Sequence, residues 1–154
     1  MNFLRFLFHI DTNLTLFLCP DLLDHLNLAC ISTQEKSAKN IIRKTSRMAN
    51  HFNCKWYVLY VQTPKENFDK IPLDKQRHLI NNFKLATELG AEIIRVNNIS
   101  ISNSIIEQVN LRNITTICIG KPKTGFFNYL FYSKTFLDLV NNKLLNNTNI
   151  IILA

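Results

Sequence analysis

The chain has 154 residues, of which 47% are hydrophobic, enough to bury one core and to indicate a single domain. Its 18 basic and 11 acidic residues give a formal net charge of +7, which suits an anionic ligand, a nucleic acid or an acidic protein surface without selecting among them. The four cysteines have no close pairing and the four histidines match no metal spacing, so we expect buried free thiols in a reducing compartment and no metal site.

The amino terminus, residues 1–24, differs from the rest of the chain. Its apolar stretches are interrupted by His9, Asp11 and Asn13, so none approaches the ~20 apolar residues that span a bilayer. A single Arg5 and the lack of a small-residue cleavage site make it a poor secretory signal. We therefore expect no transmembrane segment and an extension that packs or docks, with attachment to a membrane surface as the alternative.

The next segments alternate between strand and helix patterns. A strand is predicted over residues 26–32, followed by a helix with apolar residues at helical spacing and Ser37 as its amino-terminal cap. The run KWYVLYVQ, residues 55–62, is almost continuously apolar, as in a strand buried on both faces. Pro64 ends this strand, because proline cannot donate a ladder hydrogen bond.

The rest of the chain repeats this alternation. A second helix runs through residues 79–89 and is closed by Gly90 at the C′ position. The remaining predicted elements are a strand at 92–98, a short helix around 105–109, a strand at 115–120, a helix through 136–144 and a last strand at 149–154. Five strands that alternate with four helices predict an α/β fold, with an open parallel sheet covered by helices on both faces.

Polar loops follow three of the predicted strands. They are STQEKS after the first strand, QTPKEN after the second and GKPKTGFF after the fourth. Open parallel sheets bind ligands outside the carboxyl ends of their strands, where the strand order reverses. Hydroxyl groups, lysines and helix amino termini at that edge suit a phosphate-bearing ligand.

Several segments of the chain resemble a known family. LNLACIST, SAKNIIRKTSRMANHFNCKWYVLYVQTP, KLATELGAEIIRV and ITTICIGKPK are similar to the universal-stress-protein-like cytoplasmic domain of the KdpD potassium-sensing histidine kinases. The resemblance covers residues 25–154 and leaves residues 1–24 as an extension outside it. It implies the strand order 3-2-1-4-5, a cytoplasmic location and a domain that modulates the output of a kinase.

Other parts of that kinase family are not identified in the sequence. There is no G-x-x-x-x-G-K-[ST] phosphate-binding loop, and no phosphoacceptor-histidine helix, kinase core or transmembrane bundle is recognised. No nucleophile–base pair or paired carboxylates stand out either. We therefore expect a sensory domain that is not an enzyme, encoded either alone or as part of a truncated kinase.

The resemblance suggests two nucleotide ligands, of which ATP is the first. Universal stress proteins that bind ATP carry a glycine-rich motif after the fourth strand. This chain keeps Gly120 but has Lys123 in place of the second glycine and Ser133 at the final Gly-Ser or Gly-Thr pair. A side chain at position 123 crowds a backbone that must approach phosphate closely. Lys121, Lys123 and Lys134 either attract an anion or are solvated loop lysines.

The second ligand is cyclic di-AMP, which some KdpD domains bind through two hydroxyl residues and a later aromatic-Thr-Ala-x-Tyr stretch. Trp56 and Tyr60 keep the first and last residues of that stretch. Counting back places Thr33 and Glu35 at the hydroxyl positions, with Ser32 or Ser37 as substitutes if the loop is one residue longer. Core packing is the alternative role of the two aromatic residues.

We conclude from the sequence that the chain is a cytoplasmic regulatory domain in potassium or osmotic signalling that binds a small anionic effector, with an adenine nucleotide such as ATP or cyclic di-AMP as the candidates. The alternative is a protein-docking module without a small-molecule ligand. It would dock on a histidine kinase, a transporter or a second copy through the amino-terminal extension or GFFNYLFY. No nucleic-acid partner is expected. The candidate site residues are Ser32, Thr33, Ser37, Trp56, Tyr60, Thr63, Gly120, Lys121, Lys123 and Ser133.

The last predicted strand also suggests how copies of the chain associate. In the expected strand order this strand lies at an edge of the sheet, where its backbone groups need cover. Pairing with the same strand of a second copy is one common solution. We therefore expect a weak homodimer.

Overall fold

A computed structural model describes residues 25–33, 35–120, 138–139, 141 and 148–153. Within these residues five parallel strands form one sheet in the order β3-β2-β1-β4-β5. The predicted α/β fold and strand order are thereby confirmed. The strands are β1 (Asn27–Ile31), β2 (Trp56–Gln62), β3 (Glu92–Asn97), β4 (Thr116–Gly120) and β5 (Asn149–Leu153).

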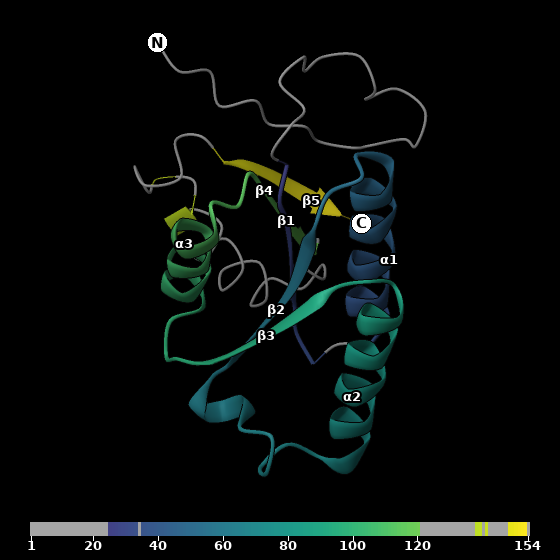
Figure 1. Ribbon diagram of the computed structural model, residues 1–154. Coiled ribbons are helices and arrows are strands. Elements are labelled where there is room, and N and C mark those ends of the chain that lie inside the picture. Colours follow the sequence, from purple (N-terminus) through teal and green to yellow (C-terminus); the bar gives the residue numbers. More distant parts are fainter. Residues whose placement is uncertain (1–24, 34, 121–137, 140, 142–147, 154) are drawn as a thin grey trace.

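Helices cover both faces of this sheet (Figure 1). The helices are α1 (Glu35–His51), α2 (Leu73–Glu88) and α3 (Ile101–Arg112), and a short 3-10 helix, η1 (Pro64–Glu66), follows β2. Figure 1 shows α1 and α2 side by side on one face and α3 on the other. The predicted helix through 136–144 falls mostly outside the described residues, within which 138, 139 and 141 are helical.

Alternate side chains of each strand enter two separate cores. Ala29, Val58 and Cys118 pack beneath α1 and α2. Leu28, Leu59 and Ile117 belong to the core beneath α3. This division explains why the sequence of β2 is apolar without interruption, since both of its faces are covered.

Local sequence signals set most of the element boundaries. Gly90 has φ +88°, and its N–H donates to the Thr87 carbonyl oxygen at 3.0 Å, which confirms it as the residue that closes α2. The predicted cap of α1 is wrong. The helix begins at Glu35, so Ser37 lies in its first turn, because the glutamate and lysine before it are good helix formers and extend the helix.

The third helix has caps that the sequence analysis did not identify. The Ser100 hydroxyl accepts a hydrogen bond from the Asn103 N–H at 3.3 Å, which satisfies one of the free donors at the start of α3. At the other end Asn113 is in the left-handed region with φ 53°, a conformation that asparagine tolerates better than most residues.

Two of the remaining predictions concern membranes and association. None of the helices in the described part of the chain combines the length and the apolarity needed to cross a bilayer. The strand β5 does lie at an edge of the sheet, opposite β3. The weak homodimer and the domain boundary at residue 25 stay predictions, and residues 1–24 lie outside the described part of the chain.

One buried side chain in α2 is polar. Asn82 has no exposed surface and lies among the apolar residues that α2 turns toward the core. Neither its amide nitrogen nor its amide oxygen has a hydrogen-bond partner among the described residues. A buried amide without partners costs about 1–3 kcal/mol of stability, because it loses its hydrogen bonds to water and gains none.

Replacement of this amide by an apolar side chain should stabilise the fold. We expect Asn82→Leu to raise the free energy of unfolding by about 1–2 kcal/mol, measured from the urea midpoint. Asn81→Leu is the matched control, because Asn81 is exposed on the same helix, and its effect should stay within about 0.5 kcal/mol. A loss of stability in Asn82→Leu would show that the amide has a stabilising partner.

Candidate functional site

Two buried hydroxyl groups at the carboxyl ends of β1 and β2 converge on Glu66. Thr33 follows β1 and is 5% exposed, and its hydroxyl donates a hydrogen bond to the Glu66 carboxylate, Oγ1 to Oε1, at 3.2 Å. Tyr60 lies in β2 and is 1% exposed, and its hydroxyl donates to the Glu66 backbone oxygen, also at 3.2 Å. The adjacent strands therefore hold one residue of the following loop.

The loop after β2 is folded so that Glu66 faces these hydroxyls. Pro64 opens η1, and the Glu66 N–H donates to the Thr63 carbonyl oxygen at 2.9 Å. The Asn67 side-chain oxygen then accepts hydrogen bonds from Gln62 Nε2 at 3.1 Å and from the Asp69 N–H at 3.3 Å. The segment with η1 consequently lies beyond the ends of β1 and β2 (Figure 1).

Tyr60 is held firmly as a hydrogen-bond donor. Burial, with a smaller contribution from the negative charge of Glu66, raises the pKa of Tyr60 to about 12. Its ring meets Phe83 edge to face, with ring centroids 5.9 Å apart. The Arg95 guanidinium lies 4.3 Å from the centroid of the Phe83 ring. Tyr60 therefore stays protonated over the physiological pH range and has little freedom to turn.

A second close approach occurs at the reversal of strand order. The chain leaves β1 toward β2 and β3 on one side and returns to β4 and β5 on the other. Gly120 ends β4, and a Cβ at this position would lie 2.8 Å from the Ser37 Oγ and 3.0 Å from the Ile41 Cδ1. The first turn of α1 therefore approaches the end of β4 so closely that only glycine fits without a shift.

The structure brings together part of the predicted site. Ser32, Thr33 and Ser37 lie around the β1–α1 connection. Tyr60 and Thr63 lie at the end of β2, and Gly120 lies at the end of β4. All these residues belong to the same edge of the sheet, because the strands are parallel. Lys121, Lys123 and Ser133 lie outside the described residues.

Trp56 is not brought to this edge. It begins β2 and pairs in register with Asn27, whereas Tyr60 pairs with Ile31. At ~3.3 Å per residue the two positions are ~13 Å apart along the strand. Trp56 is 3% exposed and belongs to the core beneath α1 and α2, which matches the core-packing alternative.

Glu66 is the site residue that the sequence analysis did not identify. It belongs to the QTPKEN loop that follows β2, but its distance from Thr33 along the chain gives no sign of their contact. No group of three or more histidine, cysteine or acidic residues in the described ranges is arranged to hold a metal ion. The described hydrogen bonds at this edge therefore involve hydroxyls, backbone groups, the side-chain amides of Gln62 and Asn67 and the carboxylate of Glu66.

The chain is similar to two curated sensor proteins. It is 39% identical to the sensor protein KdpD of Clostridium acetobutylicum over 115 residues, which are 72% of this chain and 12% of that protein. It is 28% identical to the sensor protein KdpD of Escherichia coli over 95 residues, 62% of this chain and 10% of that protein. The chain thus spans about a tenth of the length of these relatives. No protein-family profile matches it.

Solved structures with the same fold are universal stress proteins. The universal stress protein from Archaeoglobus fulgidus aligns with a TM-score of 0.63 at 14% identity, covering 86% of this chain and all of that protein. A structure of the universal stress protein from Archaeoglobus fulgidus in complex with dAMP aligns with a TM-score of 0.58 at 14% identity, over 86% and 99% of the two chains. A universal stress protein in complex with cAMP gives 0.61 at 11% identity, over 84% and 96%.

The chain belongs to the KdpD-like domains with the universal-stress-protein fold. The resemblance in sequence and the strand order of the structure agree on this assignment, so the predicted family is confirmed. At 14% and 11% identity, the solved structures establish the fold of this KdpD-like domain.

The described cysteines of the KdpD-like domain are free thiols at different depths. Cys118 in β4 is fully buried, and burial raises its pKa from 9.0 to about 11, an effect that the nearby Thr45 partly offsets. Cys54 is partly exposed, and its sulfur accepts a hydrogen bond from Asn27 Nδ2 at 3.2 Å. Burial raises the pKa of Cys54 as well, so it is the partial exposure of the Cys54 sulfur that should make it the more reactive of the two thiols.

The burial of Cys118 should affect its rate of alkylation and the stability of the domain at alkaline pH. Iodoacetamide at pH 8 should modify Cys54 well before Cys118, as followed by peptide mass spectrometry. The unfolded thiol ionises from about pH 9 but the native one does not until about pH 11, so Cys118 alone should lower the stability across this window by up to ~1.4 kcal/mol per pH unit, and Cys30, whose pKa is also raised by burial, adds to the fall. Cys118→Ala should show a shallower fall. Equal alkylation rates would contradict this placement.

The contact at Gly120 should be measurable as an energetic coupling. Gly120→Ala should lower the free energy of unfolding by about 1–3 kcal/mol, because the new methyl group meets the Ser37 hydroxyl and Ile41. Addition of Ser37→Ala removes one of these clashes and should restore part of the loss. A double-mutant cycle by urea denaturation measures the coupling, and strictly additive effects would show that Ser37 is not the obstacle.

Proposed function

We propose that this KdpD-like domain is a cytoplasmic regulatory domain that binds an adenine nucleotide at the carboxyl edge of its sheet. Bound nucleotide would change how the domain acts on a histidine kinase in potassium or osmotic signalling. The domain performs no chemistry in this proposal. Its role is to make the output of the kinase depend on whether the nucleotide is bound.

The observation that carries the proposal is the clustering of hydroxyl groups and a close backbone approach where the strand order reverses. Thr33, Ser37 and Gly120 belong to three segments that meet at this edge. Hydroxyls and backbone N–H groups at the start of a helix are suitable donors to phosphate oxygens. The formal net charge of +7 also favours an anionic ligand.

Two further facts support an adenine nucleotide. The universal stress proteins with this fold include structures in complex with dAMP and with cAMP. The sequence resemblance adds ATP and cyclic di-AMP as candidates. Tyr60 is 1% exposed and already donates its hydroxyl to Glu66, so we infer that it positions the loop after β2 and does not stack on the base.

Thermal unfolding in the presence of nucleotides tests the proposal. AMP, cAMP, ATP and cyclic di-AMP are compared with inorganic phosphate at equal ionic strength, because nonspecific attraction to charge is screened by salt. A nucleotide at 100 times its dissociation constant stabilises by about 2.7 kcal/mol, which should raise the melting temperature by about 5–10 °C. If no nucleotide raises it more than phosphate does, the protein-docking alternative replaces this proposal.

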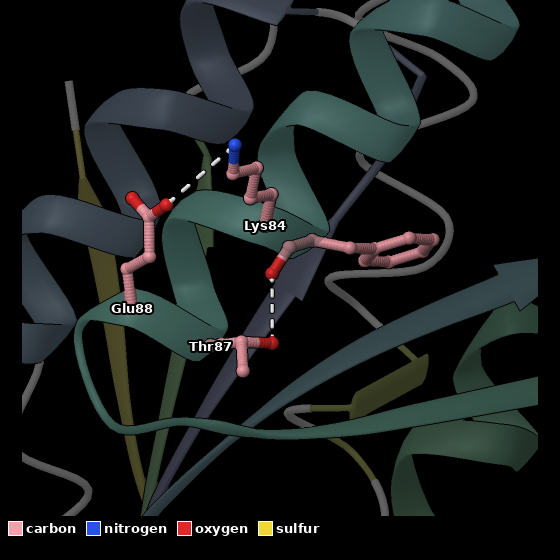
Figure 2. Close-up of polar contacts among 4 residues, drawn as sticks. Lys84, Thr87 and Glu88 are labelled. Carbon is pink, nitrogen blue, oxygen red and sulfur yellow. Dashed lines mark hydrogen bonds and ion pairs between the residues drawn. The ribbon is translucent and has the colours of Figure 1, made fainter.

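A matched pair of threonine variants locates the site. Thr33→Val should remove most of the nucleotide-dependent shift, because it deletes a hydroxyl at the proposed phosphate position. Thr87→Val is the control, since Thr87 lies at the far end of α2 and donates only to the Phe83 carbonyl oxygen at 3.0 Å (Figure 2). Equal shifts in both variants would place the ligand elsewhere.

A further inference from the structure

The carboxylate of Glu66 already accepts the hydrogen bond from the hydroxyl that the proposed ligand requires. Thr33 donates its one hydroxyl proton to the Glu66 Oε1 at 3.2 Å. A hydroxyl has one proton to donate, so it cannot serve this carboxylate and a phosphate oxygen at the same time. We propose that Glu66 is the affinity-determining residue of the anion site, a resident carboxylate that a bound phosphate must displace. This inference rests on the proposed function.

The position of Glu66 is built into the fold and is not a chance surface contact. Its backbone oxygen accepts from the buried Tyr60 hydroxyl, and its N–H donates to the Thr63 oxygen at 2.9 Å. Asn67 ties the same loop to Gln62 through side-chain atoms 3.1 Å apart. These contacts fix the backbone of residue 66 and leave the carboxylate as the part that can turn away.

Displacement of the carboxylate therefore requires only a side-chain rotation. The two backbone hydrogen bonds of residue 66 can persist while the contact with the Thr33 hydroxyl is broken. If the carboxylate stays nearby, it repels a phosphate group, because two negative charges interact most strongly at short separation. Both effects weaken the binding of anions and leave the binding of uncharged molecules almost unchanged.

The substitution Glu66→Gln tests the effect of the carboxylate charge. Glu66→Gln keeps the length of the side chain and an oxygen that accepts from Thr33, but it removes the charge. We expect Glu66→Gln to bind AMP about tenfold or more tightly than the unaltered domain, measured by isothermal titration calorimetry. Affinity for adenosine, which has no phosphate, should change little. Glu66→Ala is a second variant and should show the same preference for the charged probe.

The matched control is Glu88→Gln. Glu88 lies at the opposite end of the sheet, at the end of α2, and is exposed beside Lys84 at 4.0 Å (Figure 2). This substitution removes the same charge from the domain without touching the proposed site. It should leave the affinity for AMP within about twofold of the unaltered domain, since exposed distant charges are screened.

The outcomes separate this inference from the proposed function. Equal affinity of the unaltered domain and Glu66→Gln for AMP overturns the inference and leaves nucleotide binding intact. An equal gain for adenosine and AMP also overturns it, because the effect would then come from the loop and not from charge. Binding by Glu66→Gln alone supports the inference but overturns nucleotide binding by the unaltered domain. No binding by any variant overturns both.

Discussion

The structure depends on a central strand that is covered on both faces. β1 pairs with β2 on one side and with β4 on the other, and four of its five residues are buried. Such a strand needs apolar side chains in both directions, and helices must cross each face to shield them. The positions of α1, α2 and α3 follow from this requirement. All five strands are parallel, and the described connections from β1 to β4 each cross from one edge of the sheet back to the other, as parallel pairing requires.

The same constraint creates the candidate site. Since the strands run in one direction, the loops after β1, β2 and β4 meet at one edge. The sheet extends from β1 to β2 and β3 on one side and to β4 and β5 on the other, and at this reversal the start of α1 approaches Gly120. Buried polar residues also occur in the helices, as Asn82 and Ser104 show, but those of this edge lie at or just after the ends of the strands. Thr33 and Tyr60 are buried, and the hydroxyl of each has a hydrogen-bond partner because it donates to an oxygen of Glu66.

Buried polar groups therefore have two different roles in this domain. Those at the strand ends organise a loop, and each hydrogen bond fixes a backbone position that a ligand site can use. Asn82 in α2 is different, because its amide lies in the apolar layer without a partner among the described residues. A fold that tolerates such a cost is held mainly by its apolar layers, in which the strands and helices contribute alternate side chains.

The sequence by itself determined the five strands, the helices α1, α2 and α3, their order and the family. Continuous apolar runs, helical spacing and Gly90 act through neighbouring residues, so they can be recognised without a fold. They also indicated the polar loops at the strand ends. The sequence did not distinguish Trp56 from Tyr60, because the end of a strand that a residue occupies matters only after parallel strands are aligned. The contact between Thr33 and Glu66 spans 33 positions, and only the tertiary structure decided it, because two loops meet there through the pairing of β1 with β2.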